Sequence, residues 1–411
     1  MPEPHARRRA AVRAHLRERD VAAMLVTDLL NIRYLTGFTG SHAALLVHAE
    51  DEQSSEGRTA FATDGRYATQ AGEQVPDLEH VIDRAGDLAL AGRVAERADE
   101  HGRVGFESHR VTVDRCDALA EAAGPAELVR APGLVEQLRS IKDEAEVEAL
   151  RAACAVADRA LADLLEHGGL RPGRTEREVA RELESRMLDH GAAGPSFETI
   201  VATGANSAVP HHRPGPAPLA DGDFVKMDFG ALVNGYHSDM TRTVVLGSAA
   251  QWQRELYELV RAAQAAGRAA LLADADVREV DTAARAVIES AGRGEQFVHG
   301  LGHGVGLEIH EAPSLSQRGT GRIEPGMAVT VEPGVYVPER GGVRIEDTLI
   351  VRESSRATGN GPAGDGPTRD GTARGGPSRD GAARDGAARD EAARSDAAEL
   401  LTLTTKELVV V

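Results

Sequence analysis

The chain has 411 residues, which is long enough for two domains that each bury a core of their own. Hydrophobic residues make up 41% of it and charged residues 27%, as is typical of a globular protein. The formal net charge of −18, from 65 acidic and 47 basic residues, argues against a nucleic acid or another polyanion as partner.

The N-terminal segment, residues 1–23, is basic but lacks the apolar run of a signal peptide. No segment approaches the roughly 18–20 apolar residues that span a bilayer. Two cysteines, Cys116 and Cys154, are too few for a disulfide framework and lie outside any CxxC spacing. These features predict a cytoplasmic protein without a membrane or nucleic-acid partner.

Short apolar segments alternate with helical patterns in the first third of the chain. The strand-like segments are residues 21–26, 43–47 and 104–106, and the helical ones are residues 87–98 and 113–123. This alternation predicts an α/β domain with a mixed sheet over residues 1–137. The segment 31–38, which has Tyr34 near its centre, is expected to form a strand or a turn.

The composition changes near residue 138, and we place the start of a second domain, residues 138–411, at this point. A long helix rich in Ala, Leu, Glu and Arg is expected first, with Ser140 or Asp143 as its N-cap residue. A second helix is expected after Thr175, where Glu178 stands at the capping-box spacing.

Glycine-punctuated strands are expected next, then two helices within residues 251–292 that break near 273–276, then strands from 327 to 351. Residues 365–394 repeat a five-residue unit that ends in Arg and contains almost nothing apolar to bury. We interpret residues 359–398 as a disordered insertion between two strands, and an interaction tail is the alternative. Such an insertion costs little, because loop-closure entropy rises slowly with length.

Two aspartates, Asp228 and Asp239, flank the hairpin signal Asn234-Gly235. If the hairpin forms, their carboxylates approach each other across neighbouring strands, and a cation between them is the simplest compensation for their repulsion. The alternative is structural, because aspartate is common in turns and Asp239 could pair with Arg242.

Three histidines, His299, His303 and His310, lie in a segment whose alternating glycines make a helix improbable. A glycine-rich loop lets the backbone approach a ligand closely, but no Gly-Lys-Ser/Thr follows, which argues against a phosphate loop. His211 and His212 lie in an earlier segment. A single histidine is usually structural, whereas this number of them indicates a site.

Two glutamates, Glu332 and Glu346, each follow an apolar strand-like segment. Either one alone could be an edge carboxylate in an ion pair with Arg344. Together with the two aspartates and His303, however, they form an oxygen-rich set that suits a pair of hard or borderline divalent ions. Two such ions about 3.5–4 Å apart can hold a hydroxide between them and polarise a carbonyl, so the set predicts hydrolysis.

These motifs occur in the order found in the pita-bread-fold dinuclear metallopeptidases, which include aminopeptidase P, prolidase and, more distantly, methionine aminopeptidase. The chain resembles this family over nearly its whole length apart from the repeat. Segment 31–38 is similar to part of the N-terminal domain that aminopeptidase P, prolidase and creatinase share. The resemblance implies a creatinase-like domain over residues 1–137 and an α+β pita-bread catalytic domain over residues 138–411.

The resemblance also implies a role for each acidic residue. Asp239 and Glu346 would bridge two divalent ions, with Mn as the expected metal and Co as the alternative. Asp228 would bind one ion, and His303 with Glu332 would bind the other. Glu332 would also act as general base on the bridging water.

The remaining polar residues of the motifs would handle the substrate. The imidazoles that would orient the scissile carbonyl are His211, His299 and His310. Arg344 would not bind the metal itself but would orient the carboxylate of Glu346 or Asp228.

The segment 343–347 resembles aminopeptidase P and prolidase. Prolidases often carry an Arg shortly after the His-Glu-x-Pro motif to hold a dipeptide's carboxylate, whereas Ser314 occupies this place here, although Arg213 or Arg318 could substitute. We therefore expect an Xaa-Pro aminopeptidase that acts on proline-containing peptides as a homodimer or higher homo-oligomer. The alternatives are an Xaa-Pro dipeptidase and a catalytically inactive pita-bread protein that serves as a binding module.

Deletion of residues 359–398 is expected to leave peptide hydrolysis unchanged, because the repeat contains no candidate site residue. The test compares kcat/KM and the sedimentation coefficient of the deletion variant with those of the full chain. Loss of activity or of oligomers would show that the repeat is more than a loop.

Overall fold

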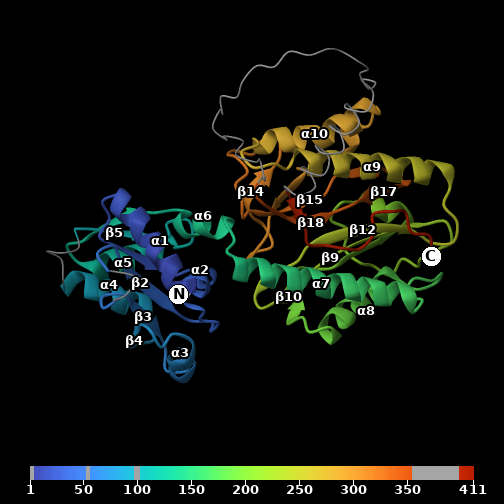
Figure 1. The fold of residues 1–411 in the computed structure, drawn as a ribbon. Coiled ribbons are helices and arrows are strands. Elements are labelled where there is room, and N and C mark those ends of the chain that lie inside the picture. Colours follow the sequence, from blue (N-terminus) through green and yellow to red (C-terminus); the bar gives the residue numbers. More distant parts are fainter. Residues whose placement is uncertain (1–3, 52–55, 97–101, 354–397) are drawn as a thin grey trace, which may run out of the picture. The chain divides into compact units, whose positions relative to one another are not determined.

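The computed structural model describes residues 4–51, 56–96, 102–353 and 398–411 (Figure 1). The chain divides into two compact units, Met1–Arg139 and Ser140–Val411. Among the helices in the described ranges, none has both the length and the apolar content required to cross a membrane.

The first unit is built on a six-stranded mixed sheet with the order β4-β3-β2-β1-β5-β6, which confirms the predicted α/β class. The strands are β1 (Ala23–Val26), β2 (Ala44–His48), β3 (Ala60–Thr63), β4 (Glu79–Ile82), β5 (Arg103–Phe106) and β6 (Glu127–Arg130). Strand β1 runs antiparallel to β2 and parallel to β5. The helices are α1 (Pro4–Glu18), α2 (Leu29–Thr36), α3 (Ala68–Gln74), α4 (Gly86–Glu96), α5 (Val113–Ala123) and α6 (Leu134–Ser140). Leu25 and Leu46 of the sheet pack with Leu90 of α4 and Leu119 of α5 in a buried core.

The prediction of a strand or turn at residues 31–38 is wrong, because most of this segment forms α2. Asp28 caps the helix, since its side chain accepts hydrogen bonds from the backbone N–H groups of Leu30 and Asn31. Gly37 ends it in the left-handed conformation at φ 80°, which glycine adopts without steric cost. Both end signals are local, but the first lies outside the segment on which the prediction was based.

The four long helices of the second unit are α7 (Glu144–Glu166), α8 (Glu176–Asp189), α9 (Gln251–Ala270) and α10 (Val277–Ser290). Three of the four begin at a side-chain cap, and α9 begins after Ala250 without one. Asp143 forms a capping box with Glu146, and Thr175 forms the predicted one with Glu178. Asp276 caps α10, so the expected break between the last two helices falls at residues 271–276.

The strands of this unit form small antiparallel sheets. One three-stranded sheet has the order β12-β9-β8, and a five-stranded sheet has the order β14-β13-β15-β18-β19. The other two have the order β11-β10-β7 and the pair β16-β17. The strands are β7 (Gly194–Pro195), β8 (Ile200–Thr203), β9 (Phe224–Phe229), β10 (Ala231–Val233), β11 (Tyr236–His237), β12 (Met240–Val245), β13 (Gly302–Gly304), β14 (Glu311–Leu315), β15 (Ala328–Val331), β16 (Gly334–Val337), β17 (Gly341–Arg344), β18 (Asp347–Val351) and β19 (Ala398–Leu400). Two short 3-10 helices, η1 (Gly204–Ala208) and η2 (Gly294–Gln296), complete the unit.

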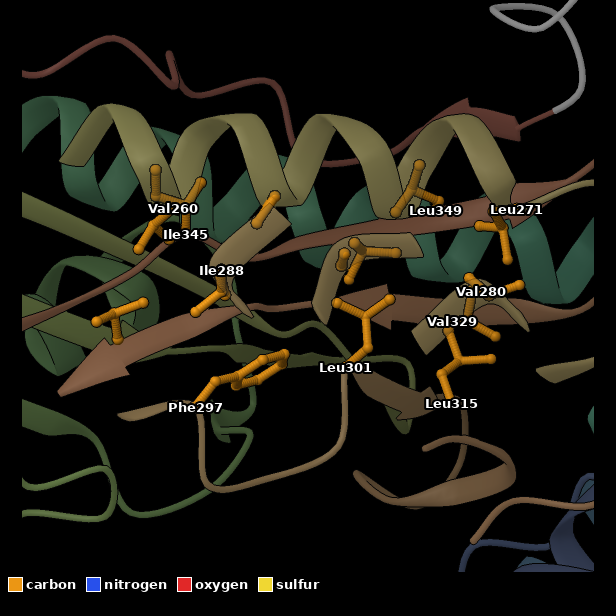
Figure 2. Close-up of a cluster of buried hydrophobic side chains, with 14 of the residues drawn as sticks. Val260, Leu271, Val280, Ile288, Phe297, Leu301, Leu315, Val329, Ile345 and Leu349 are labelled. Atoms are coloured by element: carbon orange, nitrogen blue, oxygen red, sulfur yellow. The ribbon is translucent and has the colours of Figure 1, made fainter. Parts of the chain in front are cut away.

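The two helix pairs cover opposite sides of these strands, as Figure 1 shows for α9 and α10 on one side and α7 and α8 on the other. Val260 and Val280 of the first pair pack with Leu301, Val329 and Leu349 in one buried cluster (Figure 2). Leu161 and Leu183 of the second pair belong to another cluster with side chains of β9 and β12. This arrangement of helices outside a strand layer confirms the predicted pita-bread architecture.

The segment after β19 is bound to the interior of the second unit. Buried Arg242 on β12 donates to the carbonyls of Thr404 and Thr405, and Thr402 Oγ1 donates to Asp347 Oδ1 at 2.8 Å. Strand β19 itself pairs with β18. The predicted insertion at 359–398 lies outside the described residues, except for Ala398 at the start of β19.

Candidate metal centre

Each of the five predicted ligands lies on a strand or directly beside one. Asp228 is on β9 and His303 on β13, while Asp239 immediately precedes β12. Glu332 follows β15, and Glu346 stands between β17 and β18. The hairpin predicted at Asn234-Gly235 forms, with both turn residues at positive φ, and leads the chain from β10 into β11.

These side chains line one cleft of about 310 Å³ in the second unit. The predicted site residues among its lining are His211, Asp228, Asp239, His303, His310, Glu332, Arg344 and Glu346. An adjoining hollow contains His299 and shares four of the residues of the cleft. All nine site residues predicted from the sequence therefore gather in one region.

Three of them have the spacing of metal ligands. One ligand atom from each of Asp239, His303 and Glu346 lies within 4.8 Å of the others. His303 Nε2 lies 3.6 Å from Asp239 Oδ2 and 3.5 Å from Glu332 Oε1. Asp228 Oδ1 is buried and has no hydrogen-bond partner among the described residues, although buried polar atoms normally have one. An orphaned carboxylate oxygen beside this cluster fits a cation in the cleft.

The carboxyl groups strongly perturb one another. Burial, followed by the charges of neighbouring carboxylates, raises the pKa of Asp239 and of Glu346 well above their usual range. Burial also raises the pKa of Glu332 to about 8, and Asp228 contributes to the same shift. Burial lowers the pKa of His303 to about 4, which keeps its imidazole neutral. The carboxyl shifts come from burial and from the crowding of like charges, and a divalent cation would lower these pKa values again.

Hydrogen bonds fix the orientation of the ligand side chains. His303 Nδ1 donates to the carbonyl of Gly304 at 2.9 Å, which leaves Nε2 free to face the carboxylates. Thr241 Oγ1 donates to Glu346 Oε2 at 2.7 Å. These contacts hold the donor atoms in place before any ion arrives.

Buried Arg344 contacts the carboxylate of Asp228 directly. Its Nε donates to Thr241 Oγ1 at 2.9 Å, so it reaches Glu346 only through this hydroxyl. Of the two partners expected for Arg344, the structure therefore gives direct contact with Asp228. Arg242 pairs instead with Asp347, which excludes the purely structural pairing considered for Asp239.

The histidines occupy different positions in the cleft. His303 and His310 stack edge to face with ring centres 4.4 Å apart. His299 Nδ1 donates to the carbonyl of Gly300, and His299 Nε2 lies 2.9 Å from the hydroxyl of Tyr336. Burial, with the nearby Arg344, lowers the pKa of His299 to about 3, so this ring is neutral.

Two further residues beside the site were missed from the sequence. Tyr336 on β16 accepts a hydrogen bond from Arg344 Nη1 at 2.8 Å. Lys226 on β9 is fully buried, and burial together with Arg344 lowers its pKa. A lone Lys in an apolar strand was the one available signal, since lysine is almost never fully buried without partners.

Comparison with known proteins yields consistent matches for both units. Residues 148–353 match metallopeptidase family M24, and residues 8–141 match the creatinase/prolidase N-terminal domain. An uncharacterized peptidase, YqhT of Bacillus subtilis, is 41% identical over 340 residues, which cover 82% of this chain and 93% of the relative. A solved Xaa-Pro dipeptidase from Bacillus anthracis superposes with a TM-score of 0.82 at 35% identity, over 99% of this chain and 100% of that one. An X-Pro aminopeptidase from Thermotoga maritima superposes with a TM-score of 0.77 at 29% identity, over 96% and 99% of the two chains.

The raised pKa of Glu332 makes the stability of the metal-free protein depend on pH. As the pH rises from the ordinary value of 4.5 to about 8, the unfolded chain releases this proton while the native protein still holds it. The free energy of unfolding therefore falls over this interval. Thermal unfolding of chelator-treated protein should show a midpoint that decreases with pH, and added Mn²⁺ should raise it most at the alkaline end.

Glu332→Gln is the matched control, because it removes the titrating group and keeps the shape of the side chain. The decline with pH should be shallower in this variant. Equal slopes in the variant and the unaltered protein would contradict the assignment of the decline to Glu332.

Proposed function

Since this chain belongs to metallopeptidase family M24 and carries a creatinase/prolidase N-terminal domain, we propose that it hydrolyses the bond between an N-terminal residue and a following proline. The observation that carries the proposal is the buried cluster of four carboxylates and one neutral imidazole in a cleft open to a peptide. The bond to proline is a tertiary amide whose ring restricts the chain, so its cleavage calls for a shaped site.

We assign the five ligand side chains to two divalent ions, with Asp239 and Glu346 shared between them. Asp228 would complete the set of one ion, and His303 with Glu332 the set of the other. Mn²⁺ is the expected metal and Co²⁺ the alternative, because carboxylates with a single imidazole suit both. When bound, the ions would lower the pKa of a water molecule and polarise the scissile carbonyl.

The protein's own groups would supply the proton transfers. Glu332 lines the cleft and lies 3.5 Å from His303 Nε2, where its carboxylate would act as general base. It would accept a proton from the attacking water and pass it to the leaving proline nitrogen. His211 and His310 face the same cleft and would donate hydrogen bonds to the carbonyl oxygen. Both ring nitrogens of His299 are engaged, so this residue would act by holding the Tyr336 hydroxyl.

We favour an aminopeptidase that accepts peptides longer than two residues. The hollow beside the metal cleft is lined by Ser314, and it shares His299 and Ser316 with a further pocket that contains Arg318. These pockets adjoin one another, so residues beyond proline would find room along them.

Two arginine side chains near the cleft favour a second candidate function, that of an Xaa-Pro dipeptidase. Arg213 lines the metal cleft and Arg318 the far pocket, and either could bind the free carboxylate of a dipeptide. The B. anthracis structure is named for this activity, whereas the T. maritima structure is named for the aminopeptidase activity.

Removal of a shared ligand should abolish turnover. In Asp239→Ala and in Glu346→Ala we expect kcat to fall by more than the roughly 10–100-fold typical of residues that only orient ligands. Elemental analysis should show incomplete metal occupancy in both. Glu279→Ala, which alters an exposed carboxylate on α10, serves as the control and should retain both properties. Near-normal kcat in either ligand variant would contradict the assignment.

The substrate class is tested with metal-stripped protein. Hydrolysis of Ala-Pro-Ala should appear only after Mn²⁺ or Co²⁺ is added, with release of free alanine. A strong preference for Ala-Pro over Ala-Pro-Ala would identify the protein as a dipeptidase. Failure to cleave either peptide with metal bound would overturn the proposed Xaa-Pro specificity, and activity that chelators leave unchanged would overturn the metal mechanism.

A further inference from the structure

The loop that carries His211 has little regular structure of its own. It begins with η1 after β8 and continues as an irregular segment through residues 209–218 to β9. His211 lies at the cleft and His212 beside it. A side chain that must meet a substrate atom within a fraction of an ångström needs a supported backbone, and this backbone is not itself part of a helix or a strand.

Lys226 provides such support from the neighbouring strand β9. Its Nζ donates to the carbonyls of Ser207 at 3.1 Å, Val209 at 2.6 Å and Pro210 at 3.2 Å. Three carbonyl acceptors match the three protons of an ammonium group. The last of these carbonyls belongs to the residue immediately before His211.

The same side chain lies against two residues of the candidate site. Lys226 Nζ is 5.1 Å from the centre of the Tyr336 ring, within the range of a cation–π contact. Arg344 Nη1 also donates to the carbonyl of Pro210, at 3.3 Å. Lys226 therefore connects the strand of Asp228, the ring of Tyr336 and the backbone beside His211.

The far side of the loop is held separately by buried Glu176, at the start of α8. Its carboxylate accepts from the N–H groups of Thr203 and Gly215, and it lies 2.7 Å from His212 Nε2. Glu176 makes no hydrogen bond to residues 207–210 among those of the described chain. Lys226 supplies three bonds to this part of the loop, and Arg344 and the N–H group of Gly342 each add one, to Pro210 and to Ser207.

We propose that Lys226 is a positioning residue for peptide hydrolysis, because it fixes the backbone of residues 207–210 and thereby holds His211 at the metal cleft. The inference rests on the proposed function, in which His211 contacts the substrate. Lys226 itself touches no reacting atom and acts only through the loop.

The test is a double-mutant cycle between Lys226 and His211. Lys226→Met keeps most of the aliphatic volume and removes the donor, so kcat for an Xaa-Pro tripeptide should fall about 10–100-fold with metal content unchanged. The double variant with His211→Ala should be no slower than His211→Ala alone, because both changes remove the same contact. Independent effects that add in the double variant, or an unchanged kcat in Lys226→Met, would overturn the proposal.

Val225→Ala is the matched control for a loss of fold stability. Val225 is the preceding residue on β9, and its side chain is buried in the opposite cluster with α7 and α8. This variant should lower the unfolding temperature while its effect on kcat stays small and adds to that of His211→Ala. If Lys226→Met does not fold, Lys226→Gln, which retains an amide donor, takes its place in the cycle.

Hydrogen exchange gives a readout that needs no substrate. The backbone amides of residues 204–215 should exchange faster in Lys226→Met than in the unaltered protein, and Val225→Ala should leave them unchanged. Unchanged exchange in Lys226→Met would contradict the positioning role whatever the substrate is. Faster exchange in a protein that cleaves no Xaa-Pro peptide would support the loop contact and place the failure in the proposed function instead.

Discussion

The mutual repulsion of buried carboxylates is the constraint on which the second unit depends. Asp228, Asp239, Glu332 and Glu346 face one cleft, and within the described residues the cation in direct contact with this set is Arg344. Four acidic groups cannot all ionise in such a space without further positive charge, and burial with neighbouring charges raises the pKa of Asp239, Glu332 and Glu346. Packing elsewhere in the unit must offset the free-energy cost of keeping them together, and the same crowding of negative charge favours a divalent cation in the cleft.

The rest of the unit supplies the rigidity that holds these carboxylates close together. Each ligand is fixed to a strand, and the strands are covered on both sides by helix pairs with extensive apolar clusters (Figure 1). Polar contacts transmit this rigidity to the donor atoms, as Thr241 does between Arg344 and Glu346. Lys226 and Glu176 extend the same principle to an irregular loop, one through backbone carbonyls and the other through backbone N–H groups. Buried charges here stabilise positions of the backbone, and uncharged side chains provide most of the core.

The sequence was sufficient to predict a structural feature where that feature depends on nearby residues or on a known motif. The N-cap at Asp143, given with Ser140 as the other choice, the capping box at Thr175 and the Asn234-Gly235 turn were predicted because each depends on residues a few positions apart. The candidate ligands were recognised from their residue types, but their individual roles came from the resemblance to a family, since no local rule relates Asp228 to Arg344, 116 positions away. Tyr336 and Lys226 were missed for the same reason, because their roles arise from contacts that only the tertiary structure creates. The helix at α2 was missed because its cap, Asp28, precedes the segment considered.

The binding of the segment after β19 has a consequence for how the protein is made. Arg242 donates to the carbonyl of Glu346 and also to the carbonyls of Thr404 and Thr405, while Thr402 binds Asp347. These late residues leave the ribosome after every ligand of the cleft has been synthesised. The environment of Glu346 therefore reaches its final form only after translation has passed residue 405. Until then Arg242 lacks the carbonyl acceptors of Thr404 and Thr405, so the hydrogen-bond network behind Glu346 is incomplete in the nascent chain.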